Sequence, residues 1–166
     1  MVNHITDALI LRSGTVADTE SCVALWVVAC ATRDGRAVPG VAERARPKFH
    51  KQNGWIIAER PDSSLAGFAL ATAPGTGLST DPAEAAVLGL LAVDPLEQGI
   101  GLGRSLLSEI SVALSASGFD QVVLHALIDN HAAVRLYESA GWTPYGRTSE
   151  HSLLKRPMQT YRHALL

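Results

Sequence analysis

The sequence predicts a single α/β domain in which helices lie on both faces of a mixed β-sheet. Three observations lead to this fold class. The chain has 166 residues, of which 47% are hydrophobic and 18% charged, which is enough for one good core but short for two domains. An apolar run from Val87 to Val93 leads through a turn straight into a helical pattern. Strand patterns follow one another early in the chain, whereas strands and helices alternate in its second half.

The first strand is expected over residues 8–12, which are mostly apolar. Thr15 or Asp18 can then cap an amphipathic helix, which the polar sequence Arg-Asp-Gly-Arg ends. Cys22 and Cys30 both fall in this helix, where their separation along one helix is too large for a disulfide. We therefore interpret both cysteines as small core residues in a reducing compartment.

Apolar residues at four-residue intervals predict a second, exposed helix over residues 40–52, which Pro47 interrupts. Two short strands follow, over residues 55–59 and 65–72, and a polar loop joins them as a hairpin. The stretch 74–82 is rich in Gly, Thr, Ser and Pro, which indicates a flexible loop before the next strand.

The turn after the central strand is rich in glycine. A strand over residues 84–93 should end there, because Pro95 cannot continue a strand ladder. Gly99, Gly101 and Gly103 then open a helix, although each glycine inside a helix costs roughly 1 kcal/mol relative to alanine. A bound phosphate can offset this cost, because glycine leaves backbone N–H groups uncovered and the helix dipole favours negative charge there.

The last third of the chain continues the alternation of strands and helices. Residues 121–128 predict a strand that is buried on at least one face. Asn130 can cap the helix that follows, which stops at Gly141. Residues 142–147 and 158–165 predict the closing strands.

Two motifs stand about 30 residues apart, with a helix and a strand between them. The first is the sequence Gln-Gly-Ile-Gly-Leu-Gly that starts at Gln98, directly after the apolar strand. The second runs from Asn130 through Leu-Tyr at Leu136 and Tyr137 to Gly-Trp at Gly141. In this order they resemble the Q/R-x-x-G-x-G/A and N-x-x-A-x-x-L-Y-x-x-x-G-F motifs of the GNAT superfamily of acyl-CoA-dependent N-acyltransferases. The likeness covers nearly the whole chain, and it implies one domain over residues 1–166 with a mixed, mostly antiparallel sheet of six to seven strands.

The resemblance implies that acetyl-CoA is the cosubstrate. Backbone groups of the strand before the turn would pair with the pantetheine arm, as an added strand does. Backbone N–H groups of the glycine turn would hold the pyrophosphate, and Arg104 would add positive charge. The residues that the resemblance assigns to acetyl-CoA are Leu91, Ala92, Val93, Gln98, Gly99, Ile100, Gly101, Leu102, Gly103, Arg104, Asn130 and Tyr137.

Catalysis is expected at Tyr137. Asn130 and Tyr137 are seven residues apart, so they share one face of a helix, roughly 10 Å apart along its axis. By resemblance, Asn130 bonds the pantetheine amide and Tyr137 is the general acid that protonates the departing CoA thiolate. The implied reaction is direct attack of a primary amine on acetyl-CoA. Many family members place a glutamate within the strand over residues 87–91, which has no ionisable side chain here. Glu84 and His125 are the remaining candidate bases, directly or through water, and the resemblance also allows an enzyme without a dedicated base. Glu84 can equally be a solvated residue at the strand start, and His125 a hydrogen-bonded histidine of the sheet.

Other interpretations stay open. The glycines can form a simple tight corner, Asn130 a helix cap, and Tyr137 an ordinary core tyrosine. Within the same fold, the chain can be a non-catalytic acyl-CoA-binding module or use a longer acyl donor. A nicotinamide-dependent oxidoreductase is a weaker alternative, because the third glycine of its fingerprint would fall at Arg104 and Asp120 lies before the next strand, not at its end.

The charge pattern favours a small-molecule or peptide amine as the acceptor. Residues 31–60 carry seven Lys and Arg against three acids, whereas residues 61–120 carry seven acids against a single arginine. With only 5% aromatic residues, the pattern does not describe a nucleic-acid binder. In this family the basic segment from Arg33 to Lys51 flanks the acceptor groove, so a preference for an acidic acceptor is one hypothesis.

The sequence has no apolar run of membrane-spanning length, and its first seven residues show neither basic residues nor an apolar signal core. We therefore expect a cytoplasmic protein without a membrane partner. The histidines and cysteines show no ligand spacing, so no metal site is expected. The resemblance also allows a homodimer, although nothing in the sequence fixes an interface.

Overall fold

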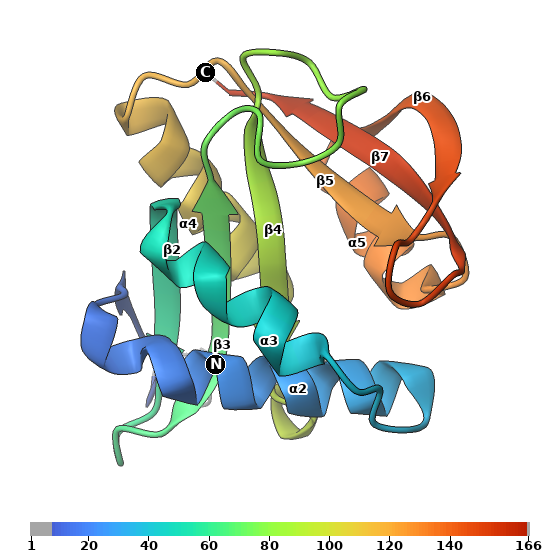
Figure 1. Cartoon of the computed structure of the whole chain (residues 1–166). Coiled ribbons are helices and arrows are strands. Elements are labelled where there is room, and N and C mark those ends of the chain that lie inside the picture. The colour runs from blue at the N-terminus through green and yellow to red at the C-terminus, as the bar shows by residue number, and fades with distance from the viewer. Residues whose placement is uncertain (1–7, 166) are drawn as a thin grey trace.

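The computed structural model describes residues 8–165, so the first seven residues, on which the expectation of no signal segment rests, lie outside it. In the described chain one sheet has the strand order β1-β2-β3-β4-β5-β7-β6 (Figure 1). Neighbouring strands are antiparallel except β4 and β5, which are parallel. This confirms the predicted mixed, mostly antiparallel sheet. The strands are β1 (Ile10–Ser13), β2 (Gln52–Glu59), β3 (Leu65–Thr72), β4 (Ala86–Val93), β5 (Gln121–Leu127), β6 (Thr143–Glu150) and β7 (Pro157–Ala164).

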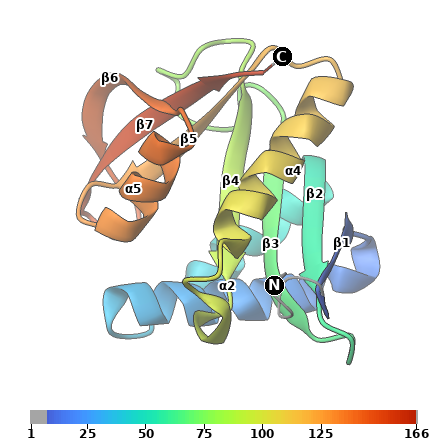
Figure 2. The ribbon, with the colours of Figure 1, turned by 180° about the vertical axis from the view of Figure 1, so that it is seen from behind.

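Helices cover both faces of the sheet, as predicted. Helices α2 and α3 lie across one face of β2 to β4 (Figure 1), whereas α4 lies across the opposite face and α5 lies beside β5 and β7 (Figure 2). No helix within residues 8–165 is long and apolar enough to cross a membrane. The helices are η1 (Val16–Asp18), α2 (Thr19–Asp34), α3 (Val41–Ala45), η2 (Arg46–His50), η3 (Pro95–Glu97), α4 (Leu102–Ala116) and α5 (His131–Ser139), where η denotes a 3-10 helix.

Two apolar cores form, one on each face of the sheet. Leu106, Ile110 and Leu114 of α4 are fully buried against the inner strands and pack with Trp142. Cys22 and Val23 of α2 are buried on the other face, in a cluster that includes Phe49, Trp55 and Phe68. Both cysteines are free and buried, which confirms the interpretation of Cys22 and Cys30 as core residues.

The sheet splits at its centre. Strand β4 pairs with β3 as far as Val93, but it pairs with β5 only at Ala86 and Val87. A bulge interrupts β4 near Gly89, where the pairing with β3 shifts by one residue. Beyond it β4 and β5 diverge (Figure 1), so the edge of β4 that faces β5 has no strand partner. This divergence positions the functional site.

Several element boundaries differ from the predicted ones. The predicted helix over residues 40–52 is divided into α3 and η2, with Pro47 in the first turn of η2, where a missing N–H costs least. Strand β2 begins at Gln52, whereas the expected start was residue 55. Gly54 lies inside the strand, at a bulge. A Cβ on Gly54 would lie 3.0 Å from Ile110 Cδ1, so the glycine lets α4 pack closely on the strand. Strand β4 begins at Ala86, which leaves Glu84 in the exposed turn before it.

Candidate active site

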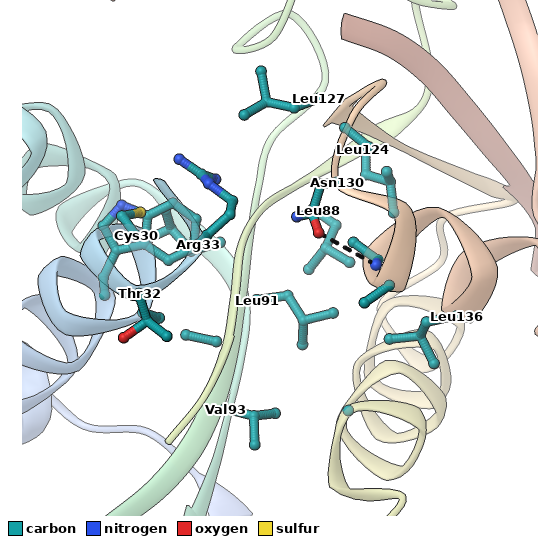
Figure 3. Close-up of a pocket in the computed structure, with 18 of the residues that line it drawn as sticks. Cys30, Thr32, Arg33, Leu88, Leu91, Val93, Leu124, Leu127, Asn130 and Leu136 are labelled. Carbon is teal, nitrogen blue, oxygen red and sulfur yellow. Dashed lines mark hydrogen bonds between the residues drawn. The ribbon is translucent and has the colours of Figure 1, made fainter. Parts of the chain in front are cut away.

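A cleft of about 700 Å³ opens where β4 and β5 diverge. Its floor is β4, one wall is formed by α2 and α3, and the other by α5 and the first turn of α4. Figure 3 shows Arg33 of α2 on one side and, on the other, Leu136 of α5 and Asn130, which directly precedes that helix, with Leu91 and Val93 of β4 between them. Every residue that the sequence assigned to acetyl-CoA lines this cleft except Ile100, whose side chain packs against the apolar core.

The N-terminus of α4 is an uncovered group of hydrogen-bond donors. Gly101 is the N-cap residue with φ of 84°, and no side chain caps the helix. The N–H groups of Leu102, Gly103 and Arg104 have no partner in residues 8–165, and the first helical bond runs from Ser105 N–H to the Gly101 carbonyl at 3.1 Å. A Cβ on Gly101 would meet no described atom within 4 Å, so the space beside it is open. This helix start fits a phosphate group.

Gly99 and Gly103, the other two glycines of the turn, contribute to it in different ways. Gly99 has φ of 88°, which a residue with a side chain rarely adopts, so it makes the turn possible. Gly103 lies within the helix, and a Cβ there would lie 3.2 Å from Leu136 Cδ2, so its absence lets α4 approach α5. Arg104 donates a hydrogen bond from Nη2 to Ser139 Oγ, which holds its guanidinium against α5.

An arginine that the sequence analysis missed fixes the turn to the sheet. Arg60, which follows β2, binds Asp94 with Nη2 at 2.9 Å and Glu97 with Nε at 2.8 Å. Asp94 Oδ1 also accepts the Leu96 N–H at 3.0 Å, which caps η3. These contacts join segments that lie more than 30 residues apart in the chain, so no local pattern could have indicated Arg60.

Asn130 and Tyr137 extend from α5 into the same cleft. Asn130 Oδ1 accepts the Ala133 N–H at 3.4 Å and caps the helix (Figure 3), and its side-chain NH₂ has no partner in the described chain. The ring of Tyr137 packs near Trp142 and Tyr161, with centroids 6.2 and 6.4 Å away. Its hydroxyl forms no hydrogen bond within residues 8–165. Burial raises the pKa of Tyr137 to about 12, so the phenol keeps its proton at neutral pH.

The two candidate bases lie in different places. Glu84 is exposed in the turn before β4 and does not line the cleft, whereas His125 of β5 does. His125 Nε2 lies 2.9 and 3.0 Å from the two carboxylate oxygens of Asp81. Asp81 also accepts the Leu78 N–H at 2.8 Å and is nearly buried. A Cβ on Gly77 would collide with the Asp81 carboxylate, so this glycine makes room for the pair.

The remaining cleft residues come from segments to which the sequence analysis gave no individual roles. Arg44 and Lys48 come from α3 and η2, and His151 comes from the loop between β6 and β7. Cys30 also lines the cleft, but burial raises its pKa to about 11, so its thiol stays protonated at neutral pH and is a poor nucleophile. Within residues 8–165, no three His, Cys, Asp or Glu side chains are arranged to hold a metal ion.

Known proteins resemble this chain in sequence and in fold. The mycothiol acetyltransferase of Thermobispora bispora is 35% identical over 128 residues, which cover 67% of this chain and 43% of that protein. The chain therefore spans less than half the length of this relative.

Two solved structures share the fold. A GCN5-related N-acetyltransferase from Kribbella flavida matches with a TM-score of 0.72 and 18% identity, covering 96% of this chain and 99% of that one. The yncA protein of Salmonella typhimurium, solved with its cofactor acetyl-CoA, matches with a TM-score of 0.69 and 20% identity, covering 96% and 95%. At these identities the likeness shows the fold alone.

A sequence model described as the acetyltransferase (GNAT) family matches residues 24–142, which is more than half of the chain. The chain therefore belongs to the acetyltransferase (GNAT) family, whose members use acetyl-CoA.

Proposed function

We propose that this chain is an acetyltransferase that moves the acetyl group of acetyl-CoA to a primary amine by direct attack. One observation carries the proposal: the unpaired edge of β4, the uncovered N-terminus of α4 and the phenol of Tyr137 line one cleft. Acetyl-CoA, when bound, supplies the acetyl group as an activated thioester. The buried thiol of Cys30 supports direct transfer without a covalent enzyme intermediate.

Main-chain groups would hold acetyl-CoA. The N–H groups of Leu102, Gly103 and Arg104 point from a positively polarised helix end and suit the pyrophosphate. The free edge of β4 at Leu91, Ala92 and Val93 suits the pantetheine arm, which offers amide groups to an unpaired strand. The side-chain NH₂ of Asn130 remains available for an amide carbonyl of that arm.

Two side chains would move the protons. Tyr137 Oη keeps a proton at neutral pH and would give it to the departing thiolate. His125, positioned by Asp81, would accept the proton that the attacking nitrogen loses. We prefer His125 to Glu84 as the base because Glu84 is exposed outside the cleft. In the transfer a C–N bond forms and the C–S bond breaks. One proton passes from the attacking nitrogen to His125, and another passes from Tyr137 Oη to the CoA sulfur.

Two alternative functions are less well supported by the fold and the comparisons. A nicotinamide-dependent oxidoreductase of the dinucleotide-binding type needs an open, parallel sheet, and the mostly antiparallel order found here contradicts it. An acyl-CoA-binding module without turnover, or a longer acyl donor, would use the same main-chain groups. The mycothiol acetyltransferase relatives favour acetyl transfer over both.

The variant Tyr137→Phe tests the proposal. We expect kcat, followed by CoA release with a library of amines, to fall about ten- to a thousandfold, the range for losing a general acid. The affinity for acetyl-CoA, measured by calorimetry, should change little, because the ring stays in place. Tyr145→Phe is the matched control, because Tyr145 does not line the cleft. Acetyl-CoA binding without CoA release from any amine would favour the binding module instead.

A further inference from the structure

Three side chains that carry hydrogen-bond donors line the acceptor side of the cleft, and no carboxylate is among them. We use the name acceptor-side cluster for Arg44, Lys48 and His151, which come from α3, η2 and the β6–β7 loop. Arg44 donates to Ser152 Oγ at 2.7 Å and forms no ion pair within residues 8–165. The side chain of Lys48 forms neither a hydrogen bond nor an ion pair in the same range, although its carbonyl accepts the Lys51 N–H at 3.2 Å.

The carboxylates near this cluster are already paired. Asp34 binds Arg33 at 2.8 Å and Arg156 at 2.7 Å, and Arg156 also binds Asp129 at 2.8 Å. At the other end, Glu97 is held by Arg60, as described above. The charges of Arg44 and Lys48 are therefore not balanced by any carboxylate of the described chain that lines the cleft.

The surroundings of Lys48 and His151 show that these groups act on one another. Burial has the largest effect on Lys48 and lowers its pKa, and repulsion from Arg44 lowers it further. Burial also lowers the pKa of His151, and Arg44, Arg33 and Lys48 lower it further, whereas Asp34 raises it. His151 Nδ1 accepts the N–H groups of Leu153 and Leu154 at 3.2 and 3.0 Å, so the proton of the neutral ring is on Nε2.

From this arrangement we propose that the acceptor is a primary amine that carries a carboxylate near its amine, as an α-amino acid does, and that Lys48 and Arg44 bind this carboxylate. The inference rests on the proposed function and names the class of its acceptor. Lys48 is half-buried and Arg44 is exposed, so water screens only part of the repulsion between their like charges, and a bound anion relieves the rest. The Nε2–H of His151 offers a third donor to the same anion.

The position of Lys48 limits the distance between the amine and the carboxylate. Its Nζ lies 3.6 Å from the place that a Cβ on Gly89 would take, directly over the bulge of β4. The unpaired edge of β4, along which the thioester arm is proposed to bind, begins at this bulge. An anion at Lys48 would therefore lie where this edge begins, and we expect a short link between the carboxylate and the reacting amine.

The experiment uses the full chain and matched acceptors. CoA release is measured for each amino acid and for its amide, which differ by one negative charge, and for dipeptides with an acidic first residue. The amine of an amide is the weaker base, so at a given pH a larger share of it is unprotonated and able to attack. This difference favours the amide and therefore opposes the expected preference for the acid. In the fastest pair we expect kcat/KM to be about ten- to a hundredfold higher for the acid, as for a charge-assisted hydrogen bond.

The variant Lys48→Met keeps the apolar stem and removes the charge. It should remove most of the preference for the acid, mainly through KM, whereas Lys51→Met should not, because Lys51 is exposed and does not line the cleft. Equal kcat/KM for acid and amide, or a preference that persists in Lys48→Met, overturns the inference and leaves the proposed function intact. If the dipeptides react faster than the amino acids, the inference is supported, and the acceptor is a peptide whose first residue supplies the carboxylate.

A binding measurement separates this inference from the proposed function. If no amine releases CoA, the proposed function fails, and the same amino acids are titrated by calorimetry into the protein with CoA present. Binding of an acid, weakened about tenfold or more in Lys48→Met, still supports the anion site. Equal heats for the variant and the unaltered protein, or no binding of any acid, overturn it.

Discussion

The end of the cleft that we propose to bind acetyl-CoA, the donor end, and the end that we propose to bind the amine, the acceptor end, are built in different ways. The donor end uses main-chain groups, namely the free edge of β4 and the first N–H groups of α4, which lie within residues 88–104. The acceptor end uses side chains from β5, from α3 and η2, and from the β6–β7 loop, and Asp81 of the loop before β4 binds His125 from outside the cleft lining. A main-chain site can be recognised from a contiguous stretch of sequence, whereas a group of side chains exists only once the fold has brought its members together.

The difference leads to predictions in which changes at one end leave the other unaffected. The largest effect is expected for His125→Ala, which removes the proposed base from the acceptor end. We expect kcat to fall about a hundredfold to ten-thousandfold, the range for losing a general base, with an unchanged affinity for CoA. Asp81→Asn should cause a smaller loss, because Asp81 positions the imidazole and does not contact the reacting atoms.

Imidazole in the assay distinguishes a base from a structural histidine. If His125 is the base, added imidazole should enter the space left by His125→Ala and restore part of the lost kcat. The control is His50→Ala, because His50 is exposed and does not line the cleft. A loss of kcat without any rescue, together with a lower melting temperature, would assign His125 and Asp81 to holding the loop before β4 in place.

The two ends also differ in how far the sequence predicted them. The strand, the glycine turn and α4 were predicted because Pro95 and the three glycines are local signals. Asp81 and Arg60 were not predicted, because their partners lie 44 and more than 30 residues away along the chain. The family resemblance predicted that the basic segment flanks the acceptor groove, but the sequence could not distinguish Lys48, which lines the cleft, from the exposed Lys51.

The fold was predicted more completely than the site. The strand and helix patterns depend on neighbouring residues, and all seven strands within residues 8–165 lie near their expected positions. The split between β4 and β5 depends on the bulge at Gly89, and a glycine inside an apolar run does not by itself reveal a bulge. The roles assigned to Tyr137 and Asn130 stay predictions, although the structure places both in the cleft.

A second prediction concerns the donor end. In Gly101→Val the added side chain would project into the open space beside the first turn of α4, and we expect the Kd for CoA to rise about ten- to a hundredfold. With CoA saturating, KM for the acceptor should not change. Calorimetry measures the first quantity and steady-state kinetics the second.

The control for Gly101→Val must carry the same backbone strain. Gly35, the C-cap residue of α2, has φ of 76° against 84° for Gly101, and a Cβ there also meets no described atom within 4 Å. Gly35→Val should therefore lower the melting temperature by a similar amount without weakening CoA binding. Equal losses of CoA affinity in both variants would mean that strain, and not the phosphate site, is responsible.

The smallest effect is expected for Asp34→Asn, which tests whether ion pairs hold the acceptor end. Hydrogen bonds from Arg33, opposed by burial and assisted by Arg156, keep the pKa of Asp34 below its ordinary value. The carboxylate therefore stabilises the fold above the unfolded pKa of about 3.9, and this stability is lost as the pH falls through the folded pKa. At pH 7 the variant should lose about 1 kcal/mol in urea unfolding, and the difference should shrink below about pH 4, where the unaltered protein loses the same charge.

The substitution Asp34→Asn should affect binding at the acceptor end only. Asp34 joins the end of α2 to the β6–β7 loop through Arg156, so its loss should raise KM for the acceptor. The Kd for CoA should stay constant, because the first turn of α4 depends on glycines and main-chain donors and on no contact of Asp34. Glu20→Gln, which breaks an exposed pair with Arg46 outside the cleft, should alter neither quantity. A rise in the Kd for CoA with an unchanged acceptor KM would show that the two ends are coupled through α2, and the division into a main-chain end and a side-chain end would then be wrong.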